Sequence, residues 1–400
     1  MVQSNALTNA ALSRFIVLSM LAGIGVGLAK VTTALYAVSL NPSALELGLI
    51  AAAQTAGLLI TSLPCGVLVE RLGPLRLFVS GSLCAALIYP WVPAIAEPLY
   101  LLALTLFASL CMPCRFVSLN TVFMHQLPLM GQTRAGWFRG AQMIGLLLIG
   151  PTLAALLIER LGVTGSWHWI ALAFALPVLL APSVLGRYPA QRAVAERLSL
   201  RALLQPLALL RTEPALRRNC LLDFSVQAAA MYFAFFIIAI TVQDYGWSAG
   251  QAAALLSAHG AAFIGALFLL GRVVEGHGNK GLLCSLLLVS AALLTLALAR
   301  TPALLWLGAL LLGISLGLLQ IVTLARYAQQ GQRLGIGRMA GLAALVGPAG
   351  GMSGCLLGGI LGTSFSLQQL FLGLAPLFLS FLLAPLGRYC RPFFIARRPS

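Results

Sequence analysis

Long apolar stretches alternate with short polar segments along the whole chain. Each stretch has about 20 or more mainly apolar residues, the length that an α-helix needs to cross the hydrocarbon core of a bilayer. We therefore predict an all-α membrane protein with twelve transmembrane helices. Their expected ranges are Arg14–Leu40, Leu45–Val69, Leu75–Ile95, Leu99–Val122, Trp137–Ile158, Trp167–Gly186, Asn219–Val242, Ser248–Leu270, Leu282–Ala299, Ala303–Ala325, Gly337–Leu361 and Leu367–Gly387.

The basic residues follow the same alternation. Of the 25 Lys and Arg residues, all but Arg160, Arg300, Lys30 and Arg115 lie in every second polar segment, beginning with the N-terminal one. Cytoplasmic loops of membrane proteins carry such an excess of positive charge. We therefore expect both termini in the cytoplasm of a multi-pass protein of the bacterial inner (plasma) membrane.

The composition excludes a soluble domain, because 60% of the residues are hydrophobic and only 8% are charged, against about 25% charged in soluble proteins. The net charge of +16 would otherwise suggest a nucleic-acid partner. Here the basic residues lie in short loops beside apolar helices, where they set topology and contact anionic lipid headgroups. We expect a monomer in the lipid bilayer and no nucleic-acid binding.

A long polar segment divides the twelve stretches into two sets of six. The predicted domains are an N-terminal six-helix bundle at 1–186, a cytoplasmic linker at 187–218, and a C-terminal six-helix bundle with a basic cytoplasmic tail at 219–400. The run from Gly66 to Gly73 has a counterpart from Gly271 to Gly278, 205 residues later. Parallel repeats of this kind place a substrate path at their interface near mid-membrane.

The segment after the second stretch carries Gly66, Glu70, Arg71, Gly73 and Arg76. It resembles the loop motif G-x-L-x-D-R-x-G-R-R of the major facilitator superfamily, although Glu70 replaces Asp and two expected basic positions are Pro74 and Leu75. The resemblance covers essentially the whole chain and implies two pseudo-symmetric six-helix bundles. It also implies that this loop, with Gly271, Glu275 and Gly278 in the second half, latches an inner gate. The alternative is a turn that only carries topology-setting charge.

The fifth stretch contains Gly150 and Pro151, followed by Ala154 and Ala155. These residues resemble the G-P-x-x-G-G motif of the superfamily's exporters, which implies efflux by antiport. Small-residue packing between membrane helices is an equal alternative.

Two basic residues lie inside predicted helices. Lys30 is roughly 14 Å from the end of its stretch at ~1.5 Å per residue, and Arg115 is roughly 10 Å from the end of the fourth. Charges at this depth are costly and face a cavity or a partner. Because the first six stretches contain no interior acid, we expect Lys30 and Arg115 to bind an anionic substrate. In the superfamily's proton-coupled exporters, an arginine on helix four is linked to coupling, a role that Arg115 would inherit.

In the second half, Asp223 and His259 are candidates for carrying a coupling proton. His259 could titrate near neutral pH or be hydrogen-bonded within the bundle, and Asp223 is expected to pair with Arg217 or Arg218 at the surface. Further polar groups at a depth suited to a substrate cavity are Gln54, Gln142, Gln227, Tyr232 and Gln320.

Other motifs indicate neither an enzyme nor a cofactor. Cys111 and Cys114 have the spacing of a redox or metal site, but they lie in an apolar stretch without further His or Cys ligands nearby. No phosphate-binding loop or nucleophile constellation is present in the sequence. We therefore expect no metal, no cofactor and no enzymatic activity.

The leading hypothesis is a secondary active transporter with proton-coupled efflux of a small anionic or zwitterionic organic metabolite by alternating access. A carboxylate-bearing metal chelator of the siderophore type is one such substrate. An uptake symporter for an organic anion or nutrient is the first alternative. A non-transporting membrane sensor on the same fold is the second, and the short loops argue against it.

Overall fold

The computed structural model describes residues 9–188 and 208–390, without the side chains of 9–11, 125–139, 271–279, 336, 337, 340 and 383–390. Every regular element in these ranges is helical. The first half comprises α1 (Asn9–Ser39), α2 (Ala44–Leu72), α3 (Pro74–Ile88), the 3-10 helix η1 (Tyr89–Ala94), α4 (Pro98–Ile144), the π-helical turn η2 (Gly145–Ile149) and α5 (Gly150–Leu185). The second half comprises α7 (Pro214–Gln243), α8 (Ala249–Leu269), α9 (Gly271–Ala297), α10 (Pro302–Leu334), α11 (Ile336–Leu361) and α12 (Leu370–Cys390).

The predicted twelve crossings agree with these helices. In the described part of the chain, 10 helices are long and apolar enough to span a membrane. One of them, Gly140–Leu185, covers the fifth and sixth predicted spans except for a few end residues, and the twelfth corresponds to the shorter apolar helix Leu370–Leu382. The fifth and sixth spans meet at Gly162, whose φ of 71° is the left-handed conformation that glycine adopts without a Cβ clash.

The internal repeat extends to helix capping. Ser43 accepts a hydrogen bond from the Glu46 amide at the start of α2, and the Glu46 side chain accepts one from the Ser43 amide. Ser248 and Gln251 make the same reciprocal pair at the start of α8, again 205 residues later. Such a capping box satisfies two amides that the helix itself leaves free. The second helix of each half therefore begins by the same device.

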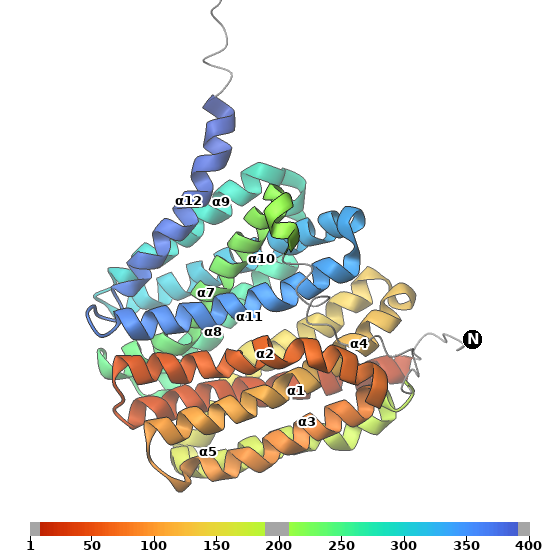
Figure 1. Ribbon diagram of the computed structural model, residues 1–400. Coiled ribbons are helices and arrows are strands. Elements are labelled where there is room, and N and C mark those ends of the chain that lie inside the picture. Colours follow the sequence, from red (N-terminus) through yellow and green to blue (C-terminus); the bar gives the residue numbers. More distant parts are fainter. Residues whose placement is uncertain (1–8, 189–207, 391–400) are drawn as a thin grey trace, which may run out of the picture.

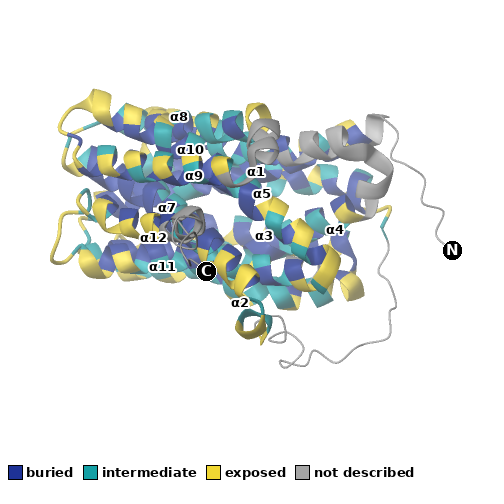
Figure 2. Cartoon of the chain, turned by 90° about the horizontal axis from the view of Figure 1, so that it is seen from above, coloured by how far each residue is buried: buried dark blue, intermediate teal, exposed yellow. Residues whose placement is uncertain are grey.

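Figure 1 shows the helices of the first half in the lower part of the molecule and those of the second half in the upper part. Within the first half, α1 packs on α5 and α2 packs on α4. Within the second, α7 packs on α11, and α10 lies between α8 and α9. The halves meet where α2 contacts α11 and α5 contacts α8. Figure 2 shows buried residues running through the middle of both halves.

Small residues allow the helices to approach closely within each half. Gly150 of α5 lies against Gly27 of α1, and Gly350 of α11 lies against the backbone of Phe224 on α7. Both contacts join the fifth helix of a half to its first helix. Gly150 allows this close approach in the first half.

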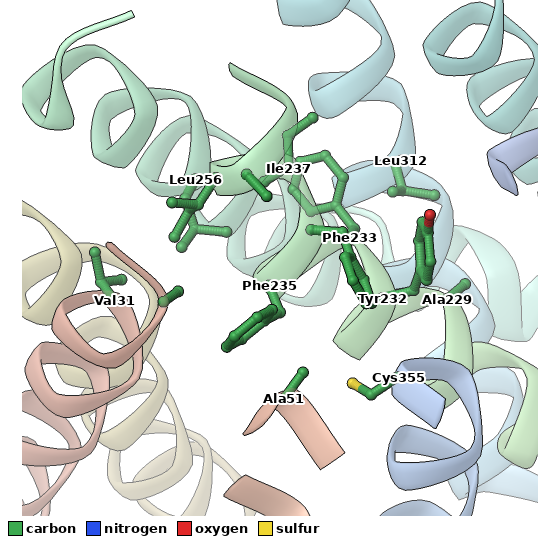
Figure 3. Close-up of a cluster of buried hydrophobic side chains, with 14 of the residues drawn as sticks. Val31, Ala51, Ala229, Tyr232, Phe233, Phe235, Ile237, Leu256, Leu312 and Cys355 are labelled. Carbon is green, nitrogen blue, oxygen red and sulfur yellow. The ribbon is translucent and has the colours of Figure 1, made fainter. Parts of the chain in front are cut away.

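One end of the molecule is closed where the halves meet. Gly48 near the start of α2 touches Gly359 near the end of α11, backbone against backbone. Next to this contact, apolar side chains from both halves form one buried cluster. Figure 3 shows Phe235 of α7 pointing toward Ala51 of α2 and Val31 of α1. We call this the closed end.

The opposite end, where α1 begins, is open between α2 and α11. The two helices diverge toward it in Figure 1, and a Cβ added at Gly66 of α2 or Gly341 of α11 would have no neighbour within 4 Å. Toward this end of α4, a hollow of about 440 Å³ is lined by Val117, Asn120, Thr121 and Met124. We call this the open end.

The contact between α5 and α8 does not diverge in this way. Glu159 of α5 lies against Gly250 near the closed end, and Gly140, in the last turns of α4 before η2 and α5, lies against Phe268 near the open end. Between them, the hydroxyl oxygens of Thr152 and Ser257 are 3.3 Å apart. The halves therefore separate along one edge only.

Candidate functional site

Lys30 stands where the two halves meet at mid-helix depth. Its Nζ lies 3.6 Å from Sδ of Met231 on α7, and its side chain lines a small pocket in the first half. The pocket is formed by Val26, Ala29, Lys30 and Thr33 of α1, Gln54 of α2, Tyr89 of η1, and Thr105, Ser109 and Met112 of α4. Its volume of about 30 Å³ is enough for one water molecule or a small polar group.

This pocket offers hydrogen-bond donors without matching acceptors. Gln54 Nε2 is buried and has no hydrogen-bond partner. No acid pairs with Lys30, because the ion pair formed in the described part of the chain joins Arg333 and Glu213. The pocket therefore suits an acceptor or an anion, and it brings Lys30 and Gln54 together.

Arg115 lies in the core of the first half rather than in this pocket. Only 1% of its surface is exposed, and its guanidinium carbon lies 4.2 Å from the Phe174 ring centre and 5.6 Å from that of Phe78. None of its three nitrogens has a hydrogen-bond partner. Tyr89, which lines the pocket, packs on Phe174 with ring centres 5.0 Å apart. Arg115 is thus behind the aromatic wall of the Lys30 pocket and acts on it only through its field.

Asp223 corrects an expectation. It does not pair with Arg217 or Arg218 at the surface, since those two side chains are exposed whereas Asp223 is only 4% exposed. Its Oδ2 accepts a hydrogen bond of 3.3 Å from the Tyr327 hydroxyl on α10. The sequence indicated the depth of Asp223 along α7 but not the direction of its side chain, which faces α10 rather than the surface.

The remaining polar residues take structural positions in this conformation. His259 is buried with Nδ1 3.1 Å from the Ala309 carbonyl oxygen and its ring centre 4.3 Å from that of Phe233. Tyr232 donates a 2.6 Å hydrogen bond to the Leu367 carbonyl. Gln227 Nε2 donates to Gln320 Oε1 at 3.0 Å, and Gln142 Oε1 is buried without a partner. None of them lines the Lys30 pocket.

The predicted gating loop connects α2 and α3 at the open end. Glu70, Arg71 and Arg76 are exposed, and Gly73 has a φ of 81° at the junction between the helices. Gly66 does not serve close helix packing, because no atom would contact a Cβ placed there. The second-half counterparts Gly271, Glu275 and Gly278 lie outside the residues whose side chains are described.

Sequence reasoning missed Tyr89, Thr33 and Tyr327. Tyr89 and Thr33 line the Lys30 pocket, and Tyr327 contacts Asp223. A tyrosine or threonine in an apolar stretch carries no charge penalty that would single it out, so only the packing identifies it. The spacing of Asn219, Asp223 and Gln227, in contrast, is a visible four-residue period along one helix face.

Comparison with known proteins identifies the fold. The family model described as the Major Facilitator Superfamily matches residues 15–280. No curated protein sequence matches the chain. The solved structure of the nucleoside transporter NupG is similar with a TM-score of 0.78 at 15% identity, covering 96% of this chain and 99% of that one.

Two other solved structures are similar over most of their length. A bacterial homologue of the human lysosomal transporter Spinster, in an inward-facing and unoccupied conformation, gives a TM-score of 0.69 at 12% identity, covering 94% of this chain and 95% of that one. The human organic anion transporter MFSD10 gives 0.64 at 19% identity, covering 94% and 98%.

Proposed function

The chain belongs to the major facilitator superfamily, and from this membership we propose that it moves a small organic anion across the membrane by secondary active transport. The protein is a multi-pass membrane transporter and not an enzyme. At 12–19% identity the solved structures speak for the fold alone. The proposal for the substrate rests on this chain's own residues.

The observation that carries the proposal is the uncompensated amine of Lys30. A lysine near mid-membrane is costly unless an anion or a water-filled cavity meets it. In the described residues it meets a thioether and the polar wall of a pocket, with the Gln54 amide beside it. A substrate carboxylate entering this pocket would accept hydrogen bonds from Lys30 and Gln54 at once. The rest of the substrate would extend toward the space between α2 and α11.

The positive field of the first half supports an anion over a cation. Arg115 adds a second buried charge behind the pocket wall, and none of the buried residues described in the first half is an acid that could oppose it. A carboxylate-bearing metabolite, including a metal-chelating one, fits this field. A cationic substrate would meet like charge without a counterion.

We further propose proton-coupled efflux, with Arg115 of helix four and the Gly150-Pro151 pair as the features that support it. The alternative is uptake of the same anion by symport, which uses the same pocket. The basic loops support an orientation with the open end and both termini in the cytoplasm.

The test uses purified protein in proteoliposomes and four probes: benzoate, citrate, the neutral benzamide, and the nucleoside uridine. Lys30→Gln is compared with Lys30→Arg, which keeps the charge. A charge-assisted hydrogen bond contributes roughly 1.5–3 kcal/mol, so Lys30→Gln should weaken carboxylate binding about 10- to 100-fold. Binding of the neutral probes should not distinguish wild type from Lys30→Gln.

Two results would remove the proposal. Equal binding of benzoate and citrate by wild type and Lys30→Gln would make the lysine structural. Selective flux of uridine, with no response to either carboxylate, would replace the anion by a nucleoside.

A further inference from the structure

A polar seam joins α7 to α10 in the second half, away from the Lys30 pocket. Asn219 and Asp223 lie one turn apart on the same face of α7. Asn219 Nδ2 donates to the Thr323 carbonyl at 3.2 Å, and Asp223 Oδ2 accepts from the Tyr327 hydroxyl at 3.3 Å. One turn further on, Gln227 is bound to Gln320. Three successive turns of α7 thus make polar contacts with α10.

Two oxygens in the seam are left without a hydrogen-bond donor. They are Oδ1 of Asn219 and Oδ1 of Asp223, and both are buried. Asn219 is 0% exposed and Asp223 is 4% exposed. Leaving two acceptors unsatisfied in a membrane interior is costly, and an ionised carboxylate there costs more. The seam as it stands therefore lacks one positively polarised group.

Neighbouring charges do not supply it. The titratable groups that face Asp223 are Tyr327 and Cys220, whose Sγ lies 3.4 Å from the Tyr327 hydroxyl. Toward α11, the α7 residues on either side of Asp223 meet glycines, since Gly350 lies against Phe224 and Gly347 against Gln227. Lys30 of α1 contacts α7 two turns further on, at Met231, and His259 of α8 faces Phe233.

Two arginines stand where the seam approaches the open end. Arg218 of α7 and Arg326 of α10 lie near enough to repel each other. These charges repel any cation, but a metal cation in addition needs several oxygen ligands, and the seam offers two free ones. A proton adds no new ligand and needs only the carboxyl oxygen itself.

We infer that Asp223 binds an exchangeable proton on Oδ1 and that the protonated carboxyl donates a hydrogen bond to Oδ1 of Asn219, which makes the seam the proton-binding site of the transporter. Residues four apart on a helix are neighbours, so one proton satisfies both free oxygens. Asn219 and Tyr327 are positioning residues: Asn219 favours the protonated form, and Tyr327, as a donor, favours the ionised form. The link to transport rests on the proposed proton coupling.

The two positioning residues give opposite expectations. We would follow the carbonyl stretching band of a protonated carboxylic acid by infrared spectroscopy during a pH titration of the purified protein in lipid nanodiscs. Asn219→Leu removes the acceptor and should move the midpoint of the Asp223 band to lower pH. Tyr327→Phe removes the donor and should move it to higher pH. Each shift should be about one pH unit, the effect of one hydrogen bond.

Asp223→Asn should abolish the band, and Asp223→Glu should restore one. The matched control is Asp244→Asn, which removes an exposed acid at the other end of the same helix and should leave the buried band unchanged. A band that persists in Asp223→Asn, or midpoints that shift the same way in both positioning variants, would overturn the site. So would a band that disappears on adding sodium at constant pH, because the seam would then hold a metal cation.

Transport separates the site from the proposed function. In proteoliposomes loaded with benzoate or citrate, wild-type flux should rise when a pH gradient is imposed. Asp223→Asn should lose that response and retain exchange at equal pH. If the band titrates but the flux does not change with the pH gradient, transport is not coupled to protons and this site has no part in the transport cycle. A full gradient response in Asp223→Asn would show that another group carries the proton.

Discussion

Replacing Gly359 by alanine should force the closed end apart. A Cβ at this position would lie 2.8 Å from Gly48 Cα, 3.1 Å from the Ala44 carbonyl oxygen and 3.2 Å from that of Leu45. Non-bonded carbons prefer about 3.5–4.0 Å, so α2 and α11 must separate by roughly 1 Å. The obstacles are main-chain atoms, which cannot rotate away as a side chain can.

The energetic effect follows from the overlap. Overpacking of a tight interface costs typically 1–3 kcal/mol, which corresponds to a change of roughly 5- to 150-fold in a two-state population. Gly359→Ala should therefore lower the population closed at this end by that factor relative to the state open there. Gly359→Leu should lower it further.

The assay is a distance measurement by pulsed electron paramagnetic resonance. Spin labels at Glu97 and Arg300, both exposed and on opposite halves at the closed end, would report their separation, after the exposed Cys84 and Cys284 are replaced. Gly341→Ala on the same α11 is the matched control, because nothing lies within 4 Å of its Cβ position. Unchanged distances in Gly359→Ala and Gly359→Leu, or equal changes in the control, would refute the reasoning.

Three further predictions concern the first half. Arg115→Met should leave the free energy of unfolding unchanged or raise it by up to about 2 kcal/mol, because removal of an unpaired buried charge outweighs the lost aromatic contact. A clear fall in melting temperature would indicate an unseen anionic partner. Oxidative cross-linking of Cys65 to Cys114, whose sulfurs are 3.4 Å apart, should leave flux intact because α2 and α4 move together, and arrest that is reversed by a thiol reductant would show otherwise. Glu70→Ala or Arg71→Ala should reduce flux at equal membrane insertion, and wild-type rates in both would remove the gating role.

The sequence predicted the membrane helices well because their signal is local. An apolar stretch of sufficient length becomes a helix in lipid whatever its neighbours are. The exception is α4, which continues from the fourth predicted span through 125–139 to Ile144. Helical hydrogen bonding does not depend on side-chain polarity, so the polar segment gave no indication that the helix continues.

The candidate site was only half predictable, for a related reason. Depth along a helix follows from counting residues, and it singled out Lys30, Arg115 and Asp223. The direction around the helix axis changes by about 100° per residue and matters only relative to a partner helix. Arg115 therefore proved to face Phe174 within its own half, and Asp223 proved to face Tyr327.

Because α5 and α8 are in contact while α2 and α11 diverge toward the open end (Figure 1), the two halves separate only along the edge between α2 and α11. α2, one of the two helices at this edge, bears exposed apolar side chains such as Ile60 and Leu68, and exposed apolar side chains in a bilayer meet acyl chains. A substrate with a greasy tail can therefore keep that tail in the leaflet while its carboxylate reaches Lys30. We expect substrate to enter the site from the surrounding lipid. The transport rate should therefore depend on how much substrate partitions into the membrane as well as on its concentration in water.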